Sequence, residues 1–576
     1  MNTYRCTRFV VVLGIAFFGL SVLAQAAGAM EVQANRVAEV ALRSAKTYEN
    51  PFVDIELDAV VTQPDGKKLR VPMFWTGGSR WCLRYASSTV GVHTFRTECS
   101  DTSNTKLHGV DGKIEVAAYK GENPLYRHGP IRVAGDKRHL EHADGMPFFW
   151  LGDTWWKGLC KRLPWEGFQQ LTADRKAKGY TVVQIIGGGP YPDEPLFDPR
   201  WKNEGDMPYE NDFSKLNPAY FEYTDRRFEH LCDAGIVPAI VGAWAWHRPG
   251  YDSNIKGKMK GQMMRHWRYL IARYGAYPVI WIVAGEMRDP NWTEVAGYVY
   301  RLDPFKRLKT MHPPGIPELQ SGRKVLNNDA FCDFDILQTA HNDWASAPIT
   351  VSSFTASYSK TPIMPVVNSE VVYEWHKDAG RHDIQRYMFW VCMLSGAAGH
   401  TYGAGGVWQM NSASVHGSDA YERTPWYVAM HYPGCVQISL GKKLLEEYPW
   451  WRFEPHPEWV EPHSSTHSEP HSEWYDNHKK WAEMKGRSDL PFVAGIPGRV
   501  RFIYIPGNKS YHLVAPTVRQ LEPDVDYRAF LFEPMWGKRI DLGKVEKTPS
   551  GQTMEYQPPQ LPSPQDWVLV LERVKK

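Results

Sequence analysis

The sequence predicts an α/β fold class, a (β/α)8 TIM barrel with one β-sandwich before it and a second β-sandwich after it. Three observations support this prediction. The chain has 576 residues, which is more than one hydrophobic core usually organises, so about three domains are expected. Short runs that alternate between apolar and polar residues, typical of sandwiches, fill both ends of the chain. Between them, apolar strand-like runs alternate with helical patterns, as in an α/β barrel.

Residues 1–27 have the pattern of a secretory signal peptide. Arg5 and Arg8 precede an apolar run at 9–23, and an A-x-A-like cleavage motif follows at 24–27. The apolar run is short for a membrane span, and no later run is long enough for one. The mature protein is therefore expected to be secreted or periplasmic.

The charge balance argues against a nucleic-acid partner. The chain has 67 Lys and Arg against 64 Asp and Glu. The signal segment contains two basic residues and no acidic one, so its removal leaves 65 against 64. Nucleic-acid-binding proteins usually carry a clear basic surplus.

Residues 28–125 are predicted to form the first β-sandwich. Apolar and acidic side chains alternate through residues 52–61, the period of two that a half-buried strand requires. Cys82 and Cys99 fall in this part and could form a disulfide in an exported protein, whereas the other five mature cysteines are expected to be buried thiols. Further short strands are expected at 70–75, 81–85 and 91–97.

Residues 126–448 are predicted to form the barrel. A doubly wound open sheet is the alternative, but no G-x-G-x-x-G motif follows the first strand, so a dinucleotide site lacks its fingerprint. Eight apolar runs, separated by helical patterns and glycine stops, are expected to be parallel strands buried on both faces. They are residues 148–153, 181–186, 237–243, 279–284, 308–312, 336–340, 364–370 and 398–402.

Residues 449–490 are predicted to be a connecting segment rich in His and Pro. The spacings between its histidines fit no standard zinc site, so no metal is predicted there. Residues 491–576 return to short strand patterns and are predicted to form the second β-sandwich.

Two glutamates stand at the carboxyl ends of predicted barrel strands. Glu286 follows the run 279–284, and Glu370 ends the run 364–370. Strand ends of an α/β barrel share one face, so the two carboxylates are expected to meet there. Paired carboxylates are typical of glycoside hydrolysis, in which one protonates the leaving oxygen and the other attacks the anomeric carbon or activates water.

Other polar and aromatic residues after the predicted strands are expected to bind the substrate, because aromatic faces stack on sugars. Structural roles remain open: Arg288 or Arg386 could pair with a glutamate, and Asp153 could pair with Lys157 or cap a helix. No His or Cys cluster suits a metal, and no cofactor is predicted. The substrate-binding candidates are Asp153, Trp155, Trp156, Trp244, Trp246, His341, Tyr373, Glu374, His400, Tyr402 and Trp408.

Five segments of the predicted barrel form a distinctive set: WLGDTWW, DRKAKGYTVVQ, WIVAGE, PVVNSEVVYE and SGAAGHTYGAGGVWQ. This set resembles the apiosidase-like glycoside hydrolases, whose catalytic domain is a barrel of the DUF4038 type. The part before the barrel resembles the immunoglobulin-like DUF5060 domain. The segments VAGIPGRVRFIYIPGN and PSPQDWVLVLE resemble a C-terminal domain that is labelled collagen-binding in the family.

The resemblance implies a hydrolase of plant or algal polysaccharides, with its acid/base after strand four and its nucleophile after strand seven. Those positions are Glu286 and Glu370. The family usually has Asp after paired glycines at the first position, whereas this chain has Ala284, Gly285 and Glu286, so the resemblance implies glycosidic cleavage and no particular sugar. We therefore expect a secreted glycoside hydrolase of the retaining type; the alternatives are a non-catalytic carbohydrate-binding protein and a polysaccharide lyase.

Overall fold

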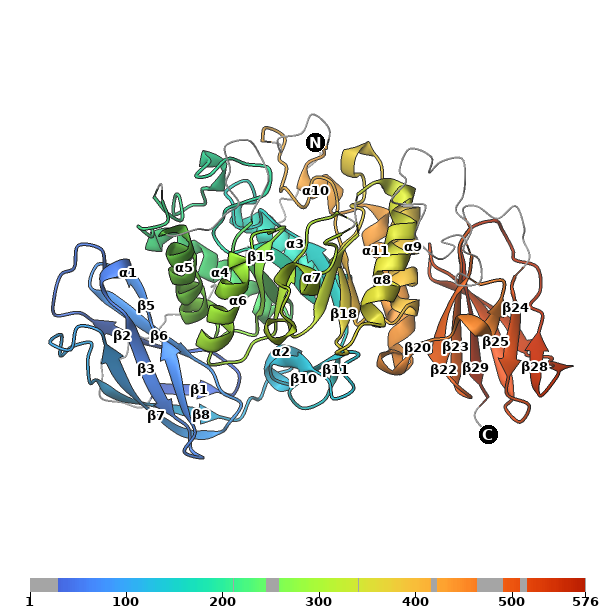
Figure 1. Ribbon diagram of the computed structural model, residues 1–576, viewed down its shortest axis with the longest axis horizontal. Coiled ribbons are helices and arrows are strands. Elements are labelled where there is room, and N and C mark those ends of the chain that lie inside the picture. Colours follow the sequence, from blue (N-terminus) through green and yellow to red (C-terminus); the bar gives the residue numbers. More distant parts are fainter. Residues whose placement is uncertain are drawn as a thin grey trace, which may run out of the picture.

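The computed structural model has three parts in a row, with an α/β barrel between two β-rich ends (Figure 1). The signal segment 1–27, Trp246 and most of the predicted connecting segment lie outside the described residues. The structure describes residues 30–210, 212–244, 258–316, 318–339, 341–415, 422–463, 490–507 and 515–574.

Two sheets form the N-terminal part, with strand orders β1-β8-β7-β3-β4 and β2-β6-β5. The predicted strand 52–61 is wrong at its start, because Pro51 begins a helical turn, α1 (Pro51–Asp54), and the strand begins only at Leu57. Proline fixes φ near the helical value and favours the first turn of a helix. The strands are β1 (Met30–Gln33), β2 (Ala38–Arg43), β3 (Leu57–Thr62), β4 (Lys68–Pro72), β5 (Phe74–Gly77), β6 (Arg80–Tyr85), β7 (Gly91–Cys99) and β8 (Asp111–Ala117).

A short helix and a small sheet precede the barrel. The helix is α2 (Pro124–Arg127), and the sheet has the order β11-β10-β9. Its strands are β9 (Ile131–Val133), β10 (Leu140–His142) and β11 (Pro147–Phe148). The predicted strand 148–153 is therefore divided between β11 and the first barrel strand.

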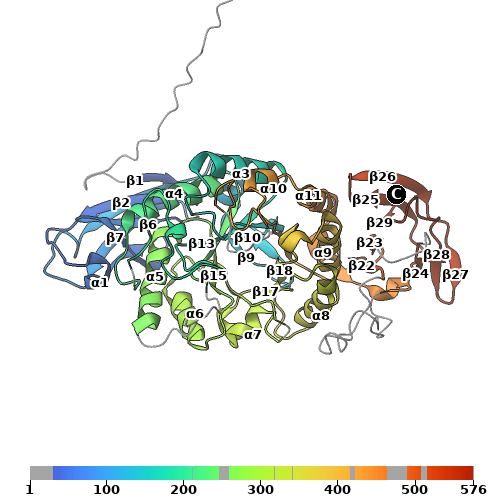
Figure 2. The same ribbon diagram turned by 90° about the horizontal axis from the view of Figure 1, so that it is seen from above.

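The barrel is confirmed, with all eight predicted strands in one parallel sheet of order β16-β15-β14-β13-β12-β19-β18-β17. The strands are β12 (Trp150–Thr154), β13 (Val182–Ile186), β14 (Val237–Val241), β15 (Ile280–Gly285), β16 (Lys309–His312), β17 (Asp335–Gln338), β18 (Val366–Glu370) and β19 (Gly399–Tyr402). Helices surround the strands in the view along the barrel (Figure 2). They are α3 (Trp165–Ala177), α4 (Pro218–Asp233), α5 (Lys258–Tyr274), α6 (Asn291–Leu302), α7 (Gly322–Leu326), α8 (Ala347–Tyr358), α9 (His382–Leu394) and α11 (Pro433–Glu446).

The ladder of the barrel stops between β16 and β17, and side chains help to join the two strands. The Thr310 hydroxyl donates to the carbonyl of Phe334 at 2.8 Å, and the Lys309 amide donates to the Asp333 carboxylate at 2.8 Å. One backbone hydrogen bond, which the Asp333 amide donates to the Lys309 carbonyl at 2.9 Å, lies just before β17. We call this boundary the β16/β17 seam.

The C-terminal part contains two more antiparallel sheets, with orders β20-β22-β23-β29-β25-β26 and β21-β24-β28-β27. Their strands are β20 (Glu454–Pro455), β21 (Val460–Glu461), β22 (Phe492–Ile496), β23 (Val500–Ile505), β24 (Thr517–Leu521), β25 (Tyr527–Glu533), β26 (Lys538–Lys544), β27 (Thr548–Ser550), β28 (Thr553–Tyr556) and β29 (Trp567–Arg573).

Buried ion pairs join both end parts to the barrel helices. Arg84 of β6 donates to the Asp225 carboxylate of α4 at 2.7 Å, and Arg273 of α5 donates to the same carboxylate. At the other end, Arg386 of α9 makes two hydrogen bonds to the Asp566 carboxylate, at 2.9 and 2.7 Å. Arg386 is therefore occupied by the C-terminal part.

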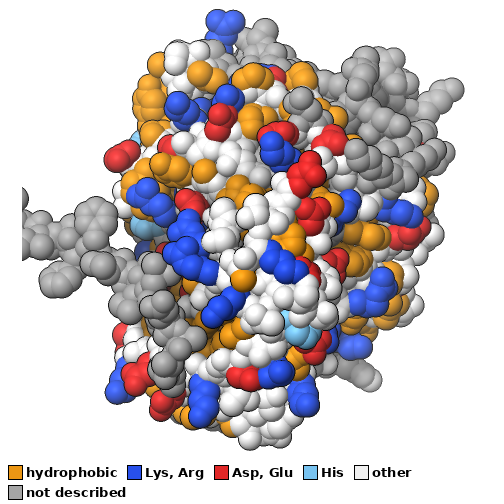
Figure 3. Space-filling model, turned by 90° about the vertical axis from the view of Figure 1, so that its left-hand side faces the viewer, with side chains coloured by type: hydrophobic (Ala, Val, Ile, Leu, Met, Phe, Trp, Pro, Cys, Tyr) orange, Lys and Arg blue, Asp and Glu red, His pale blue; other side chains and the backbone are white. Residues whose placement is uncertain are grey.

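The surface of the N-terminal end carries both signs of charge interspersed (Figure 3). Exposed pairs such as Arg96 with Asp111 make up part of it. Cys82 and Cys99 are separate buried thiols, as are the other cysteines among the described residues. Within the described ranges, no helix is both long and apolar enough to cross a membrane.

Candidate active site

Alternation along the barrel strands decides which side chains reach the inside of the barrel. In β12, the indole of Trp150 lies 5.6 Å from the ring of Phe334, which belongs to the opposite side of the barrel. Asp153 of the same strand contacts Arg175 of the outer helix α3. Odd positions of β12 therefore face the helices, and even positions face the interior.

Glu286 and Glu370 lie at the carboxyl ends of β15 and β18, and one side chain bridges them. The Nε2 atom of Gln338, at the end of β17, lies 3.0 Å from Glu286 Oε1 and 3.0 Å from Glu370 Oε1. The two carboxylate oxygens are therefore no more than about 6 Å apart, since they share one donor nitrogen. All three side chains are buried, with 6, 4 and 3% of Glu286, Glu370 and Gln338 exposed.

Two histidines also approach the Glu370 carboxylate. His312 Nε2, at the end of β16, lies 3.0 Å from Oε2, and His341 Nε2, after β17, lies 2.7 Å from Oε1. Burial disfavours the charged form of Glu370, but the two adjacent imidazoles, His312 and His341, outweigh burial and lower its pKa to about 2. Glu370 is held as a carboxylate.

The Glu286 carboxyl is shifted in the opposite direction. Burial and the negative charge of Glu370 raise its pKa well above the ordinary value, against the smaller opposing effect of Gln338. Its backbone has φ of 53°, in the left-handed region that a non-glycine residue seldom occupies. The preceding Gly285 lies directly against Trp244, because a Cβ there would come within 2.1 Å of the indole.

Aromatic side chains gather beside the two carboxylates. The rings of Trp156 and Trp244 are 4.8 Å apart, and both lie within 5.3 Å of the His312 ring. Trp156 Nε1 donates to the Tyr373 hydroxyl at 3.0 Å. Burial, followed by the Glu370 charge and its hydrogen bond, raises the Tyr373 pKa well above the ordinary value, so this phenol stays protonated. The Trp408 ring lies 6.1 Å from Tyr373.

Four substrate-binding candidates are thus brought near Glu370, either directly or through one neighbour. His341 and Tyr373 contact the carboxylate, Trp156 contacts Tyr373, and Trp244 packs on Trp156. Trp408 lies further from Glu370, beside the Tyr373 ring, and its Nε1 donates to Glu422 at 2.9 Å.

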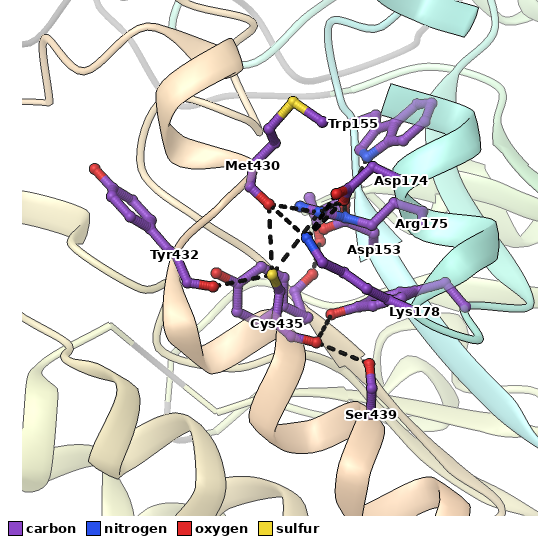
Figure 4. Close-up of polar contacts among 12 residues, drawn as sticks. Asp153, Trp155, Asp174, Arg175, Lys178, Met430, Tyr432, Cys435 and Ser439 are labelled. Atoms are coloured by element: carbon purple, nitrogen blue, oxygen red, sulfur yellow. Dashed lines mark hydrogen bonds and ion pairs between the residues drawn. The ribbon is translucent and has the colours of Figure 1, made fainter. Parts of the chain in front are cut away.

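Asp153 and Trp155 lie instead in a buried cluster between β12, α3 and α11 (Figure 4). Arg175 Nε donates to the Asp153 carboxylate at 2.6 Å, and Trp155 Nε1 donates to it at 2.7 Å. The expected structural partner, Lys157, pairs with Glu194 at 2.9 Å. The partner of Asp153 is therefore the helix residue Arg175, which sequence proximity did not indicate.

The remaining candidates also face the outer helices. Tyr402 donates its hydroxyl to Glu374 at 2.5 Å, and the amide of Gly434 in α11 donates to the same carboxylate at 3.1 Å. Burial raises the pKa of Glu374 to about 7. The His400 ring lies 5.6 Å from Phe389 of α9, and burial lowers its pKa to about 3.

Sequence reasoning missed His312 and Gln338 as site residues. Both are the last residues of barrel strands, as Glu370 is. The signal that could have revealed them is a polar residue at the end of a buried apolar strand. The sequence pattern, however, predicts both residues only as part of a strand and gives neither a role in the site. Among the described residues, no group of three or more His, Cys, Asp and Glu side chains is placed to hold a metal ion.

A parallel eight-stranded barrel with two carboxylates at the ends of its fourth and seventh strands is an arrangement typical of glycoside hydrolases. The family model described as "Apiosidase-like, catalytic domain" matches residues 134–452. This match spans more than half of the chain, and the protein belongs to the apiosidase-like family. A second model, a domain of unknown function named DUF5060, matches residues 31–100. The predicted family and enzyme class are thereby confirmed.

Solved structures share the fold. One described as a glycoside hydrolase has 19% identity and a TM-score of 0.61, covering 79% of this chain and 99% of its own. A family 5 glycoside hydrolase from Bacteroides vulgatus has 19% identity and a TM-score of 0.60, covering 79% and 95%. A candidate glycoside hydrolase from the same organism has 16% identity and a TM-score of 0.67, covering 95% and 100%. No curated protein matches the sequence.

Proposed function

We propose that this glycoside hydrolase cleaves O-glycosidic bonds in a plant or algal polysaccharide and retains the configuration of the anomeric carbon. The observation that carries the proposal is the bridged pair of carboxylates. Their shared contact with Gln338 keeps the two Oε1 atoms within about 6 Å. Retaining enzymes have carboxyl groups about 5–5.5 Å apart, and inverting enzymes need about 6.5–9.5 Å to admit a water.

The opposite pKa shifts support a division of roles. A nucleophile must be ionised, as the histidine contacts favour for Glu370. An acid must be protonated at working pH, as burial and the adjacent charge favour for Glu286. The two carboxyls then act as a pair in which one is charged and the other is neutral.

The reaction has two balanced steps. Glu370 attacks the anomeric carbon and forms an ester bond while the glycosidic carbon–oxygen bond breaks and Glu286 gives its proton to the leaving oxygen. Water then attacks the same carbon, Glu286 takes its proton, and the ester bond breaks to free the Glu370 carboxylate. No redox change occurs, and both side chains return to their starting states.

Export is part of the proposal. The basic and apolar pattern of residues 1–27 supports a signal peptide, and a polymeric substrate would be met outside the cytoplasm. The family resemblance supports a plant or algal polysaccharide as the substrate class.

The test is a screen of the purified protein against pectic and algal polysaccharides, reading reducing sugar and ultraviolet absorbance together. Glu286→Gln and Glu370→Gln should each lower turnover by several orders of magnitude while the circular dichroism spectrum is unchanged. Glu294→Gln, at an exposed ion pair on α6, is the matched control and should keep the wild-type rate.

Other outcomes would replace the proposal. Ultraviolet absorbance in the products would indicate a lyase, and binding of a glycan without any product would indicate a binding protein. Proton NMR of the first-formed product decides the stereochemistry, and an inverted anomer would exclude the retaining route.

A further inference from the structure

Gln338 occupies the point where β17 leaves regular pairing with β18. The ladder is in register up to Leu337 with Asn368, and it then shifts so that Gln338 pairs with Glu370. The extra residue, Ser369, lies on β18, so the bulge redirects the side chain that follows it, Glu370, towards Gln338. The backbone is also fixed on its other side, since the Gln338 amide donates to the Gln320 carbonyl at 3.1 Å.

The side-chain amide of Gln338 is equally constrained. A Cβ at Gly315 would lie 3.3 Å from both Cδ and Nε2 of Gln338, so the backbone of Gly315 lies close to the amide group. The Nε2 atom has two hydrogens, and it lies 3.0 Å from a carboxylate oxygen of each glutamate. Because the two N–H bonds diverge by about 120°, this arrangement spaces the two acceptors by about 5 Å.

We infer that Gln338 is a positioning residue that sets the separation of Glu286 and Glu370 by donating one amide hydrogen to each carboxyl group. The inference rests on the proposed roles of the two glutamates and deepens them. It adds Gln338 of β17, as a positioning residue, to the two glutamates that carry out the reaction.

An amide suits this position because its two N–H groups can donate to both glutamates before attack and again in the covalent intermediate. Before attack, the acceptors are a Glu370 carboxylate and a Glu286 carboxylic acid, whose carbonyl oxygen accepts. In the covalent intermediate they are a Glu370 ester carbonyl and a Glu286 carboxylate. Both pairs accept two N–H groups, so the bridge persists without any transfer of a proton to or from Gln338.

The first test compares Gln338→Met with wild type. Methionine has a similar length but no donor, so kcat should fall about 10–100-fold from misplaced carboxyls, with little change in KM. Each carboxyl also loses a hydrogen bond that favours its charged form, so both limbs of the pH profile of kcat/KM should move to higher pH. A merely structural role would not move both limbs together.

Gln437→Met is the matched control. Gln437 is also a buried glutamine, and its side chain accepts from Arg386 on the outside of the barrel. This variant should keep both limbs where they are in wild type. A Gln338→Met protein with the wild-type rate and profile would overturn the inference.

Gln338→Glu is the second test of the positioning role, to be used if Gln338→Met fails to fold. Its ionised side chain would remove both donors and add a third negative charge, which raises the pKa of both glutamates, so kcat should fall and both limbs of the pH profile should move further to higher pH than in Gln338→Met. A wild-type profile in this variant would overturn the inference. Failure of the proposed function is distinguishable, because Glu286→Gln and Glu370→Gln would then keep their turnover.

Discussion

Glu370 accepts from His341 at 2.7 Å, and removal of that contact has a definite sign. A hydrogen bond to a charged group contributes about 1.5–3 kcal/mol, which is equivalent to a pKa difference of about 1–2. His341→Ala should therefore raise the Glu370 pKa from about 2, and the acidic limb of kcat/KM should move to higher pH by that amount.

The basic limb serves as the internal control of this measurement. It reports the ionisation of Glu286, whose pKa is raised well above its ordinary value, and activity should fall as pH rises through it. The basic limb should stay nearly fixed in His341→Ala. An unmoved acidic limb would show that His341 does not hold the charge of Glu370.

Asp153 offers the opposite test, because its contacts are with Arg175 and Trp155 in the cluster of Figure 4. Asp153→Asn removes the fully buried one of the two carboxylate partners of Arg175, the other being Asp174, and loss of this charged hydrogen bond should cost about 1.5–3 kcal/mol of unfolding free energy in urea. The kcat of the folded fraction should stay near wild type.

Asp174→Asn is the comparison for this prediction. Asp174 pairs with Arg175 and Lys178 at a partly exposed site, so the loss should be smaller. A large fall in kcat for correctly folded Asp153→Asn would return Asp153 to the substrate site.

At the scale of the element, the barrel strands were predictable from the sequence. Each is buried on both faces, so the apolar residues form continuous runs between helical patterns. Glu286 and Glu370 were predictable for the same reason, since each stands at the carboxyl end of such a run. The helical turn at Pro51 was not, because the alternation of polar and apolar residues continues through it.

The sequence could not predict whether a side chain at a strand end points into the barrel or towards the outer helices. Asp153, His400 and Tyr402 lie on strands at the right end of the barrel, yet they face the outer helices. A single-residue change of register reverses the face of every side chain. The register shifts between Ile282 and Gly285 and between Leu337 and Gln338 leave no sequence signature.

Gly285 is a position where a barrel strand packs closely against an aromatic side chain. A methyl group there would overlap Trp244 at 2.1 Å, so Gly285→Ala should displace the indole and the adjacent Glu286. Overpacking of this kind costs about 1–3 kcal/mol, and kcat should fall about 100-fold. Thermal unfolding and initial rates measure the two effects.

Gly261→Ala is the control for a glycine-to-alanine change. Gly261 lies in α5, and a Cβ there would meet no atom within 4 Å. Alanine is favoured over glycine in helices by about 1 kcal/mol, so this variant should be as active as wild type and no less stable. Full activity in Gly285→Ala would show that the Trp244 contact is dispensable.

For the whole molecule, the buried Arg84–Asp225–Arg273 group joins the N-terminal sandwich to the barrel. Burial opposes ionisation of Asp225, but the two guanidinium groups outweigh it and lower its pKa from 3.8 to about 2. A carboxyl with a depressed pKa stabilises the fold above its unfolded pKa and loses that contribution as pH falls. The contribution here is about 2 kcal/mol, present above about pH 4 and lost towards pH 2.

Arg84→Met tests this junction by calorimetry. The variant should melt at lower temperature, with a separate early transition for the N-terminal part, and its stability should depend less on pH between 4 and 2. Arg96→Met, at an exposed pair within the same sandwich, should change stability by less than about 0.5 kcal/mol. One unchanged transition in Arg84→Met would show that other contacts hold the parts together.

The division of the chain at residues 125, 448 and 490 stays a prediction. Sheets with separate strand orders lie on either side of the barrel, as expected. The contacts across the junctions, however, are buried ion pairs between residues far apart in sequence, which no local composition reveals.

The β16/β17 seam has a consequence for how such an enzyme diversifies. Glu286 stands on one side of the seam and Glu370 on the other, with Gln338 reaching between them. Between the other neighbouring strands of the barrel, backbone hydrogen bonds fix the spacing. Across the seam the spacing depends partly on the side chains of Thr310 and Asp333, which a point mutation can replace. Point mutation at the seam is therefore a route by which descendants of this chain could drift between stereochemical outcomes while the scaffold is conserved.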